Sequence, residues 1–271
     1  MIGAEISDKD FERLRRFFES ASGIHLADCK KVLVCGRLSR RLRHFKLDSY
    51  REYMDLIESP NQRAERQMAI DLLTTNETHF FREPKHFERF RRVLKELADR
   101  PGSPAIRVWS AACSTGEEPY SLAMTMSEVL GGRSWSVLAS DLSMKVLEDA
   151  RLGIYQSQRF CEIPRDLAEK YVLEGFDEYA GQYRMDASLR QRVHFEQINL
   201  MEPLPRVGPF DVIFLRNVLI YFDKASKRRI VDALVQKLRQ GGLLFIGHSE
   251  TLGGVTDSVV AIEPTVYQRQ S

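Results

Sequence analysis

Polar side chains with directional hydrogen-bonding groups gather in the segment "LLTTNETHFFREPKHFERF", residues 72–90, where an amphipathic run ends and a proline-led helix begins. Asn76, Thr78, His79 and Arg82 all fall at this join. A linker needs only polarity, whereas an amide, a hydroxyl, an imidazole and a planar guanidinium together suit recognition of a ligand. We therefore interpret the join as one part of a binding site that later segments complete.

A second group of candidate residues lies in "VWSAACSTGEEPYSLAM", where a strand is predicted to end near Ala112 and a helix to open at Glu117 or Glu118. In doubly wound sheets the turn after the first strand contacts the cofactor. Acids at the helix start would repel a pyrophosphate, so Glu117 suits a ligand with hydroxyl or ammonium donors. The alternative is that both glutamates only complement the helix dipole.

Asp141 closes the next predicted strand, 25 residues after Gly116. An acid at this place accepts hydrogen bonds from ribose hydroxyls in nucleotide-binding folds. It could instead cap the helix predicted at 143–152, although Ser143 is also available. Together the two motifs indicate a nucleoside cofactor without a pyrophosphate at the turn, and S-adenosylmethionine meets that requirement.

Polar residues also follow two further predicted strands. Arg216 and Asn217 come directly after the apolar run 212–215, with Tyr221 shortly beyond. A cation and an amide at the end of a buried strand are costly without partners. They therefore indicate either a ligand or a structural ion pair, for instance between Arg216 and Asp141 or Glu117. Asn199 and Leu200 follow a strand predicted at 193–198 and could recognise an adenine edge.

A basic helix is predicted in the N-terminal part. Residues 30–46 contain seven Lys or Arg and no acid, which leaves 33 basic and 38 acidic residues elsewhere, a net charge of −5. Arg37, Arg41 and His44 share one side of this helix, with Arg40 next to them. The helix is either a solvated surface or a docking surface for an acidic partner. A protein partner is preferred to nucleic acid because no interleaved aromatic residues accompany the charges.

The elements that position these residues follow from hydrophobic periodicity. Residues 1–75 read as helices only. Beyond Ile106, short apolar runs alternate with helical ones, which predicts a doubly wound, mostly parallel α/β sheet. The predicted strands are 106–112, 135–140, 193–198, 210–215 and 242–247, with helices at 117–130, 143–152 and 224–240 and a final antiparallel pair. The stretch 153–192 interrupts this rhythm and is expected to form a small inserted β-subdomain.

The bulk composition excludes several classes of protein. With 271 residues, 43% hydrophobic and 29% charged, the chain can bury a core and is not expected to be disordered. No apolar run reaches the ~20 residues of a membrane span, and no secretory signal is evident. The four cysteines, which we expect to be reduced thiols, are Cys29, Cys35, Cys113 and Cys161. A cytoplasmic location is therefore predicted.

Five motifs in order resemble the CheR-type chemoreceptor glutamate methyltransferases: "TTNETHFFRE", "WSAACSTGEEPYSLAM", "LASDLSMKVLEDARLGIY", "FDVIFLRNVLIYFD" and "GGLLFIGHSE". The resemblance covers residues 8–267. It implies a class I S-adenosylmethionine-dependent methyltransferase domain over residues 76–271, with the β-subdomain inserted at about 154–192. It also implies an N-terminal all-α domain over residues 1–75 that docks on the receptor.

The resemblance also implies roles for individual residues. Cofactor contacts carry over onto Asn76, Thr78, Arg82, Glu117, Asp141, Asn199, Leu200, Arg216 and Asn217. The substrates implied are glutamate side chains on the cytoplasmic helical region of methyl-accepting chemoreceptors, and the second product is S-adenosylhomocysteine. Arg37, Arg40, Arg41 and His44 would form the docking surface. No metal is expected.

The implied chemistry depends on positioning. A glutamate carboxylate is already ionised at neutral pH, so it needs alignment and desolvation rather than a general base. Arg216 or His79 would orient the carboxylate, and Tyr221 would hold it or line the transfer channel. The hairpin "LEGFDEYAGQYRM" has fewer glycines than relatives that bind a receptor tether there, so the use of a tether stays open.

Two other functions remain compatible with the residues. One is a nucleic-acid methyltransferase that uses the basic helix against phosphates, although the Asn/Asp-Pro-Pro-aromatic motif of amino-methylating sites is missing. The other is a sensor that binds the cofactor without transferring its methyl group. We expect a monomer without membrane insertion, and no nucleic-acid partner.

Overall fold

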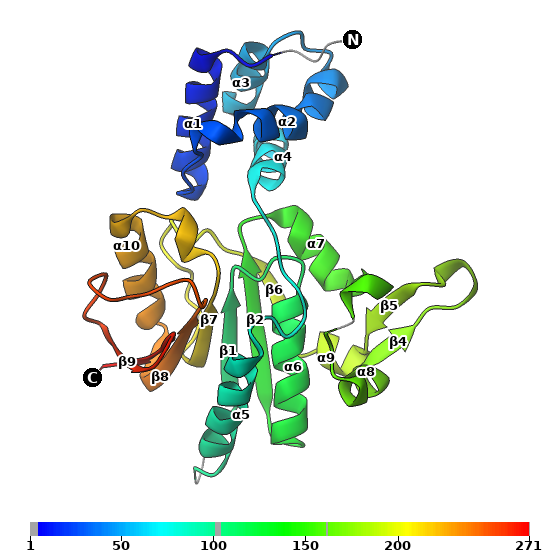
Figure 1. Cartoon of the computed structure of the whole chain (residues 1–271), viewed down its shortest axis with the longest axis vertical. Helices are drawn as coiled ribbons and strands as arrows, with labels where there is room; N and C mark the ends of the chain where they lie inside the picture. The colour runs from blue at the N-terminus through cyan, green and yellow to red at the C-terminus, as the bar shows by residue number, and fades with distance from the viewer. Residues whose placement is uncertain (1–4, 101–103, 161, 271) are drawn as a thin grey trace.

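The computed structural model describes residues 5–100, 104–160 and 162–270. A helical bundle lies above an α/β domain, and a small β-subdomain projects from the side of the latter (Figure 1). No helix within these described ranges is long and apolar enough to cross a bilayer. Cys29, Cys35 and Cys113 are free thiols, whereas Cys161 lies outside the described residues.

The N-terminal bundle contains only helices in its described part, as predicted. They are α1 (Asp8–Ser22), a 3₁₀ turn (Asp28–Lys30), α2 (Lys31–Phe45), α3 (Tyr50–Glu58) and α4 (Arg63–Leu73). Ser7 caps α1 by accepting the Asp10 N–H, and Gly23 ends it with φ 74°. Ser49 caps α3 by accepting the Glu52 N–H. The bundle has its own core of buried side chains from all four helices.

A seven-stranded sheet forms the centre of the α/β domain. Its strands are β1 (Ile106–Ala111), β2 (Trp135–Asp141), β6 (Val193–Gln197), β7 (Phe210–Leu215), β8 (Leu238–Ile246), β9 (Val259–Glu263) and β10 (Val266–Arg269). Their order is β6-β2-β1-β7-β8-β10-β9. The first five are parallel, and β10 and β9 add antiparallel at the edge. The predicted doubly wound, mostly parallel sheet is confirmed.

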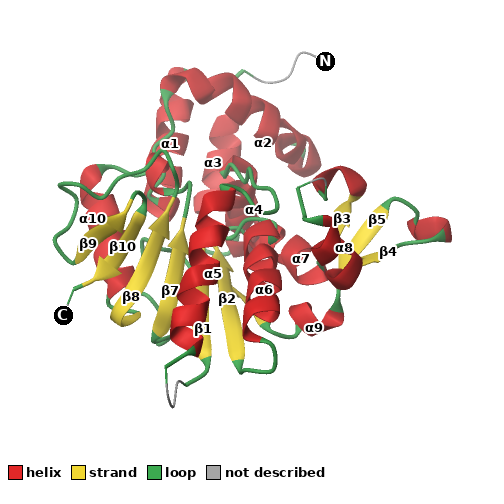
Figure 2. Ribbon diagram, turned by 60° about the horizontal axis from the view of Figure 1, so that its bottom comes forward, coloured by secondary structure: helices red, strands yellow, loops and turns green. Residues whose placement is uncertain are grey.

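Helices cover both faces of this sheet, as Figure 2 shows. They are α5 (Pro84–Ala98), α6 (Glu117–Leu130), α7 (Met144–Leu152) and α10 (Lys224–Val235). Successive strand residues point to opposite faces. Val108 therefore packs in the core under α5 and α6, while its neighbour Trp109 packs in the core under α10. The carboxyl ends of the parallel strands consequently meet at one edge, beneath the helical bundle.

One predicted boundary was wrong. The helix expected at 224–240 ends at Val235, and β8 begins at Leu238 rather than at 242. The pairing of β8 with β7 passes from Leu238 directly to Leu243, so the two glycines between them lie in a bulge of the strand. Local periodicity cannot report this, because the register with β7 is a tertiary contact.

The insertion after α7 forms a second, three-stranded antiparallel sheet in the order β3-β5-β4. Its elements are β3 (Ile154–Gln156), α8 (Arg165–Tyr171), β4 (Val172–Glu174), β5 (Gln182–Met185) and α9 (Ala187–Arg190). The predicted hairpin corresponds to β4 and β5. Figure 1 shows this subdomain beside α6 and α7, on the side of the sheet away from the C-terminus.

Candidate active site

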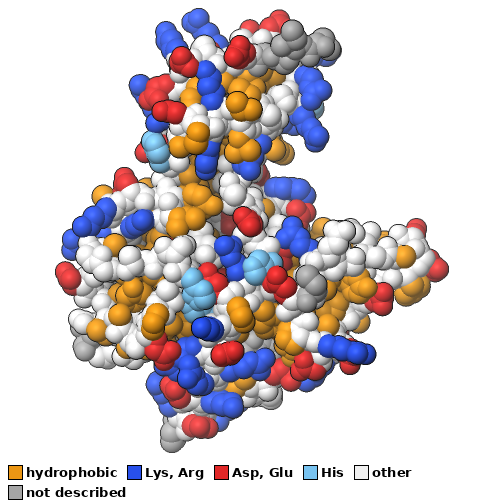
Figure 3. Space-filling view, in the orientation of Figure 1, with side chains coloured by type: hydrophobic (Ala, Val, Ile, Leu, Met, Phe, Trp, Pro, Cys, Tyr) orange, Lys and Arg blue, Asp and Glu red, His pale blue; other side chains and the backbone are white. Residues whose placement is uncertain are grey.

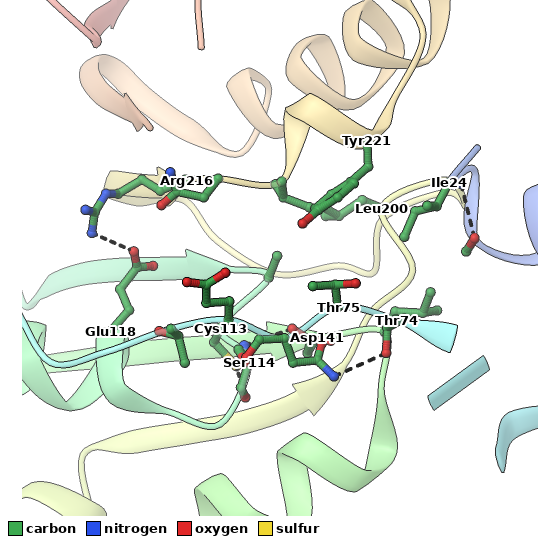
Figure 4. Close-up of a pocket in the computed structure, with 18 of the residues that line it drawn as sticks. Ile24, Thr74, Thr75, Cys113, Ser114, Glu118, Asp141, Leu200, Arg216 and Tyr221 are labelled. Carbon is green, nitrogen blue, oxygen red and sulfur yellow. Dashed lines mark hydrogen bonds and ion pairs between the residues drawn. The ribbon is translucent and has the colours of Figure 1, made fainter. Parts of the chain in front are cut away.

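A cavity opens at the carboxyl ends of β1, β2, β6 and β7, under the helical bundle. Its space, with the open solvent at its mouth included, is about 1130 Å³. Figure 4 shows two facing walls. Arg216, Tyr221, Leu200 and Ile24 lie on one wall, and Cys113, Ser114, Asp141, Thr74 and Thr75 lie on the other.

Most residues predicted for the site line this one cavity, although they come from four separate segments. They are Asn76, Thr78, His79, Arg82, Asp141, Asn199, Leu200, Arg216, Asn217 and Tyr221. Glu117 does not line it, and the neighbouring Glu118 does. The helical bundle adds Ser22, Ile24, Leu26 and Lys30 to the wall, which the sequence did not indicate.

The turn between β1 and α6 brings the backbone close to the cavity. Gly116 has φ 98°, and a Cβ there would lie 2.8 Å from the Tyr155 hydroxyl oxygen and 2.9 Å from Ala150 Cβ. Only glycine fits such a position without strain. The Ser114 N–H donates to Asp141 Oδ2 at 2.9 Å, and its hydroxyl donates to the Asn76 carbonyl at 3.0 Å. The turn is thereby tied both to β2 and to the join at 74–83.

Asp141 lies at the end of β2 with 8% of its surface exposed. Its Oδ1 accepts the Ser143 N–H at 3.0 Å, while Ser143 itself caps α7. Ser143 therefore takes the role of helix cap that the sequence left open between the two residues, and the Asp141 carboxylate stays available to the cavity. Burial raises the pKa of Asp141, and its backbone donors oppose the shift. Each carboxylate oxygen accepts one backbone N–H and keeps a further lone pair for a donor in the cavity.

Arg216 has 2% of its side chain exposed and is held on two sides. Its guanidinium donates to Glu118 Oε2 at 2.9 Å and to Glu83 Oε2 at 2.9 Å. The sequence left Asp141 or Glu117 as structural partners, and the structure supplies different ones. Figure 4 shows the guanidinium directed toward Glu118, away from Tyr221. Its charge is therefore compensated within the protein, as a buried cation requires.

Glu83 is the acceptor that organises this wall. It adopts left-handed backbone angles, φ 59° and ψ 68°, which are uncommon for a residue other than glycine. Its Oε1 accepts from the Asn217 amide at 3.1 Å and from the His248 N–H at 3.1 Å. Burial alone would raise the pKa of Glu83, but the neighbouring His86 and the charge of Arg216 outweigh it and lower the value. Glu83 is therefore an anion that anchors both Arg216 and Asn217.

Glu117 faces the β-subdomain instead of the cavity. Its side chain is fully buried and pairs with Arg159 at 3.0 Å, and Thr115 donates to it at 2.7 Å. Burial raises the pKa of Glu117. In this structure Arg159 engages the Glu117 carboxylate, and the contact of Glu117 with a cofactor stays a prediction.

His79 and Arg82 both lie on the cavity wall, but they differ in the contacts that their side chains make. The His79 ring pairs with Glu162 of the β-subdomain through Nδ1. Arg82 makes one hydrogen bond, from Nη1 to the Glu77 carbonyl at 3.0 Å. The Arg82 guanidinium consequently keeps donors for a ligand, as the sequence predicts, whereas His79 is already engaged.

Tyr221 and Asn199 connect the cavity to the helical bundle. The Tyr221 hydroxyl points into the space between the two walls (Figure 4), and Lys30 lies 5.8 Å from the centre of its ring. The Asn199 side-chain amide donates to the Ala21 carbonyl at 2.9 Å. In this arrangement the amide holds the bundle in place, and Leu200 supplies an apolar surface beside it.

The four predicted docking residues on the basic helix α2 fall into two pairs, one that contacts other residues of the bundle and one that is exposed. Arg37 donates to three carbonyls at the end of α4, Leu72 to Thr74, at 2.9–3.2 Å. Arg41 pairs with the buried Glu65. Arg40 and His44 are exposed, and Figure 3 shows basic side chains on the outer side of the bundle, where Figure 1 places α2. Arg37 and Arg41 therefore stabilise the bundle.

Three acids of the site were not predicted: Glu83, Glu118 and Glu250. Glu250 accepts the Asn217 N–H at 3.0 Å and the Gly247 N–H. The available signal was the acid in each of the motifs "REP", "GEEP" and "GHSE", which lie far from Arg216 and Asn217 in the sequence. A buried guanidinium requires such partners, but the sequence alone does not say which acids reach it.

Comparisons with known proteins identify the family of this chain. The family model described as "CheR methyltransferase, SAM binding domain" matches residues 76–268, and "CheR methyltransferase, all-alpha domain" matches residues 9–74. The chain belongs to the CheR methyltransferase family. It is 42% identical over 266 residues to "Chemotaxis protein methyltransferase" of Salmonella typhimurium, covering 97% of this chain and 90% of that protein. It is also 42% identical over 264 residues to "Chemotaxis protein methyltransferase 2" of Pseudomonas aeruginosa, covering 96% and 92%.

This CheR family member is thus a chemotaxis methyltransferase that uses S-adenosylmethionine, and its cavity fits that cofactor. Asp141 presents free acceptor lone pairs for ribose hydroxyls at the end of β2. Arg82 keeps donors for a carboxylate. Leu142, Ile198 and Leu200 provide apolar surface for a base.

Proposed function

We propose that this methyltransferase esterifies glutamate side chains of chemoreceptors in the cytoplasm, giving a glutamate methyl ester and S-adenosylhomocysteine. Two lines support the proposal. The relatives are named as chemotaxis protein methyltransferases. In addition, the Lys30 and Arg82 side chains lie on the cavity wall, where their positive charges can contact an anionic substrate side chain.

The Lys30 ammonium group beside Tyr221 is the observation that carries the choice of a carboxylate. S-adenosylmethionine supplies an electrophilic methyl group. A carboxylate oxygen of the substrate forms the new C–O bond while the C–S bond breaks, and no proton has to move. A glutamate with a pKa near ~4.3 is already ionised at neutral pH. The protein therefore needs to place the carboxylate and remove its water, and placement alone supplies roughly 7–11 kcal/mol in favourable cases.

The wall formed by Arg216 and Tyr221 provides that placement. The Tyr221 hydroxyl points into the cavity and can donate to the substrate carboxylate. Glu83 and Glu118 hold Arg216 rigidly, so we assign it to the shape and charge of the wall near the cofactor. His79, paired with Glu162, would act by fixing the join at 74–83. Ile24 and Leu200 exclude water from the same space.

Docking is proposed for the exposed side of α2. Arg40 and His44 face outward there, while Arg37 and Arg41 keep α2 on α4. A charge reversal at Arg40 should weaken binding of a receptor helix, and more so at low ionic strength. The matched control is Arg51→Glu on α3, a similarly exposed arginine.

Radiolabelled methyl transfer to a cytoplasmic chemoreceptor fragment tests the proposal. The label should enter the fragment and be released as methanol by mild base, as an ester requires. Tyr221→Phe should reduce the rate at least several-fold while binding S-adenosylhomocysteine normally, and Tyr183→Phe in the β-subdomain should not. Label that resists base would exclude an ester. Cofactor binding without transfer would support a sensor instead.

A further inference from the structure

Three side chains with metal-binding atoms converge behind the Arg216 wall. Glu83 precedes α5, His86 lies in the first turn of α5, and His248 follows β8. One ligand atom from each lies within 4.8 Å of the others. Glutamate and two histidines are a donor set found in zinc sites. The sequence predicted no metal, because the third residue lies more than 160 positions from the first two.

His86 carries a buried nitrogen that lacks a partner. Its side chain is 4% exposed, and Nδ1 has no hydrogen-bond partner among the described residues. The other ring nitrogen, Nε2, lies 2.7 Å from Thr265 Oγ1. The Thr265 hydroxyl in turn donates to the Pro264 carbonyl at 2.6 Å, so its oxygen accepts the Nε2–H. A neutral imidazole has one N–H, which leaves Nδ1 with a lone pair.

A buried acceptor nitrogen without a donor costs about 1–3 kcal/mol. A second group held by Nε2, here Thr265, is the arrangement that orients a metal-bound histidine and sets its tautomer.

The distances among the three groups are those of ligands around a common centre. Glu83 Oε2 lies 3.2 Å from His86 Nδ1 and 3.9 Å from His248 Nε2. A proton on Nδ1 would not be directed at Glu83 in hydrogen-bonding geometry. Two ligands of a tetrahedral ion with bonds near 2.0–2.1 Å are separated by roughly 3.3 Å, and their lone pairs point at the ion rather than at each other.

The charge around the cluster favours a cation. Glu83, Glu118 and Glu250 contribute three carboxylates to one hydrogen-bonded network, which contains a single guanidinium, that of Arg216. These four side chains alone, three carboxylates and one guanidinium, carry a formal net charge of −2. Glu83 and Glu250 are largely buried, and buried charges require compensation. His248 is 49% exposed and provides a route for an ion from solvent.

We propose that Glu83, His86 and His248 form a binding site for a divalent transition-metal ion, with Zn²⁺ the best match to two imidazoles and one carboxylate. Water from the exposed side of His248 would complete the coordination. Glu83 also holds Arg216 and Asn217, so the ion would share an anchor with the wall of the cofactor cavity. The proposal does not depend on which substrate is methylated.

Zinc binding to the full chain tests the site directly. Metal-free protein would be titrated with Zn²⁺ against a chromophoric chelator, and with Co²⁺ to look for the visible absorption of tetrahedral coordination. We expect one ion per chain. His248→Ala removes an exposed ligand without creating a cavity and should weaken binding tenfold or more. His86→Gln should weaken it also, as a second variant of similar size.

His194→Ala is the matched control, since His194 is an exposed histidine on β6 outside the cluster. It should bind Zn²⁺ as tightly as the wild type. Equal affinity in the wild type and His248→Ala would overturn the proposal, as would a wild type that binds no stoichiometric ion. Either result would leave His86 and Glu83 as an internal pair only.

Discussion

Replacement of Asp141 by asparagine should weaken cofactor binding by an amount that the structure sets. Both carboxylate oxygens already accept one backbone N–H, from Ser114 and Ser143. Asparagine keeps one acceptor oxygen, and its amide N–H₂ must face a backbone donor or the cofactor. The loss of one charged hydrogen bond corresponds to about 1.5–3 kcal/mol. The Kd for S-adenosylhomocysteine should therefore rise between about 10-fold and 150-fold.

Isothermal titration of S-adenosylhomocysteine measures this change. Asp71→Asn is the control, because Asp71 likewise accepts two backbone N–H groups, from Met144 and Lys145, without lining the cavity. Its Kd should stay within about twofold of the wild type. If Asp141→Asn bound the ligand as tightly as the wild type in a folded protein, Asp141 would have no role in recognition, and the assignment of the cavity would fail.

Three further changes test the packing and charge of the site. Gly116→Ala would place a Cβ 2.8 Å from the Tyr155 hydroxyl at φ 98°, so it should lower the free energy of unfolding by about 2–5 kcal/mol in urea denaturation. Burial raises the pKa of Glu117 above its ordinary 4.5, so the folded protein holds the proton more tightly. The stability of the wild type relative to Glu117→Gln should thus fall as the pH rises through that raised pKa, measured by unfolding at a series of pH values. Glu65→Ala leaves Arg41 without its buried partner and should lower the stability of the bundle by about 3 kcal/mol in thermal unfolding; an unchanged melting temperature would contradict this.

Local signals predicted most of the fold. The proline at the start of α5 acts over a few residues, and its helix forms where expected. The alternation of apolar runs and helical patterns also predicted the parallel sheet. The start of β8 was not predictable in the same way, because it depends on pairing with β7 across a bulge.

The sequence predicted which segments meet at the site better than it predicted which side chains contact one another. Asp141, Arg82 and Tyr221 line the cavity as expected, because the ends of parallel strands and the loops above them share one edge. The choice between Glu117 and Glu118 was beyond the sequence, since both follow one turn and only the packing of α6 decides which faces the cavity. The same limit applied to α2, where periodicity grouped basic residues but could not show which pair contacts α4.

The cavity is shared between two parts of the chain, and this has a thermodynamic consequence. Ile24 and Lys30 of the bundle line the same space as Asp141 and Arg216 of the α/β domain, and Asn199 holds the end of α1. A ligand in such a place binds best when the two parts are correctly juxtaposed. A partner that binds the bundle and shifts it relative to the α/β domain would therefore change the affinity for the cofactor. By reciprocity, the cofactor would change the affinity of the bundle for that partner by the same factor.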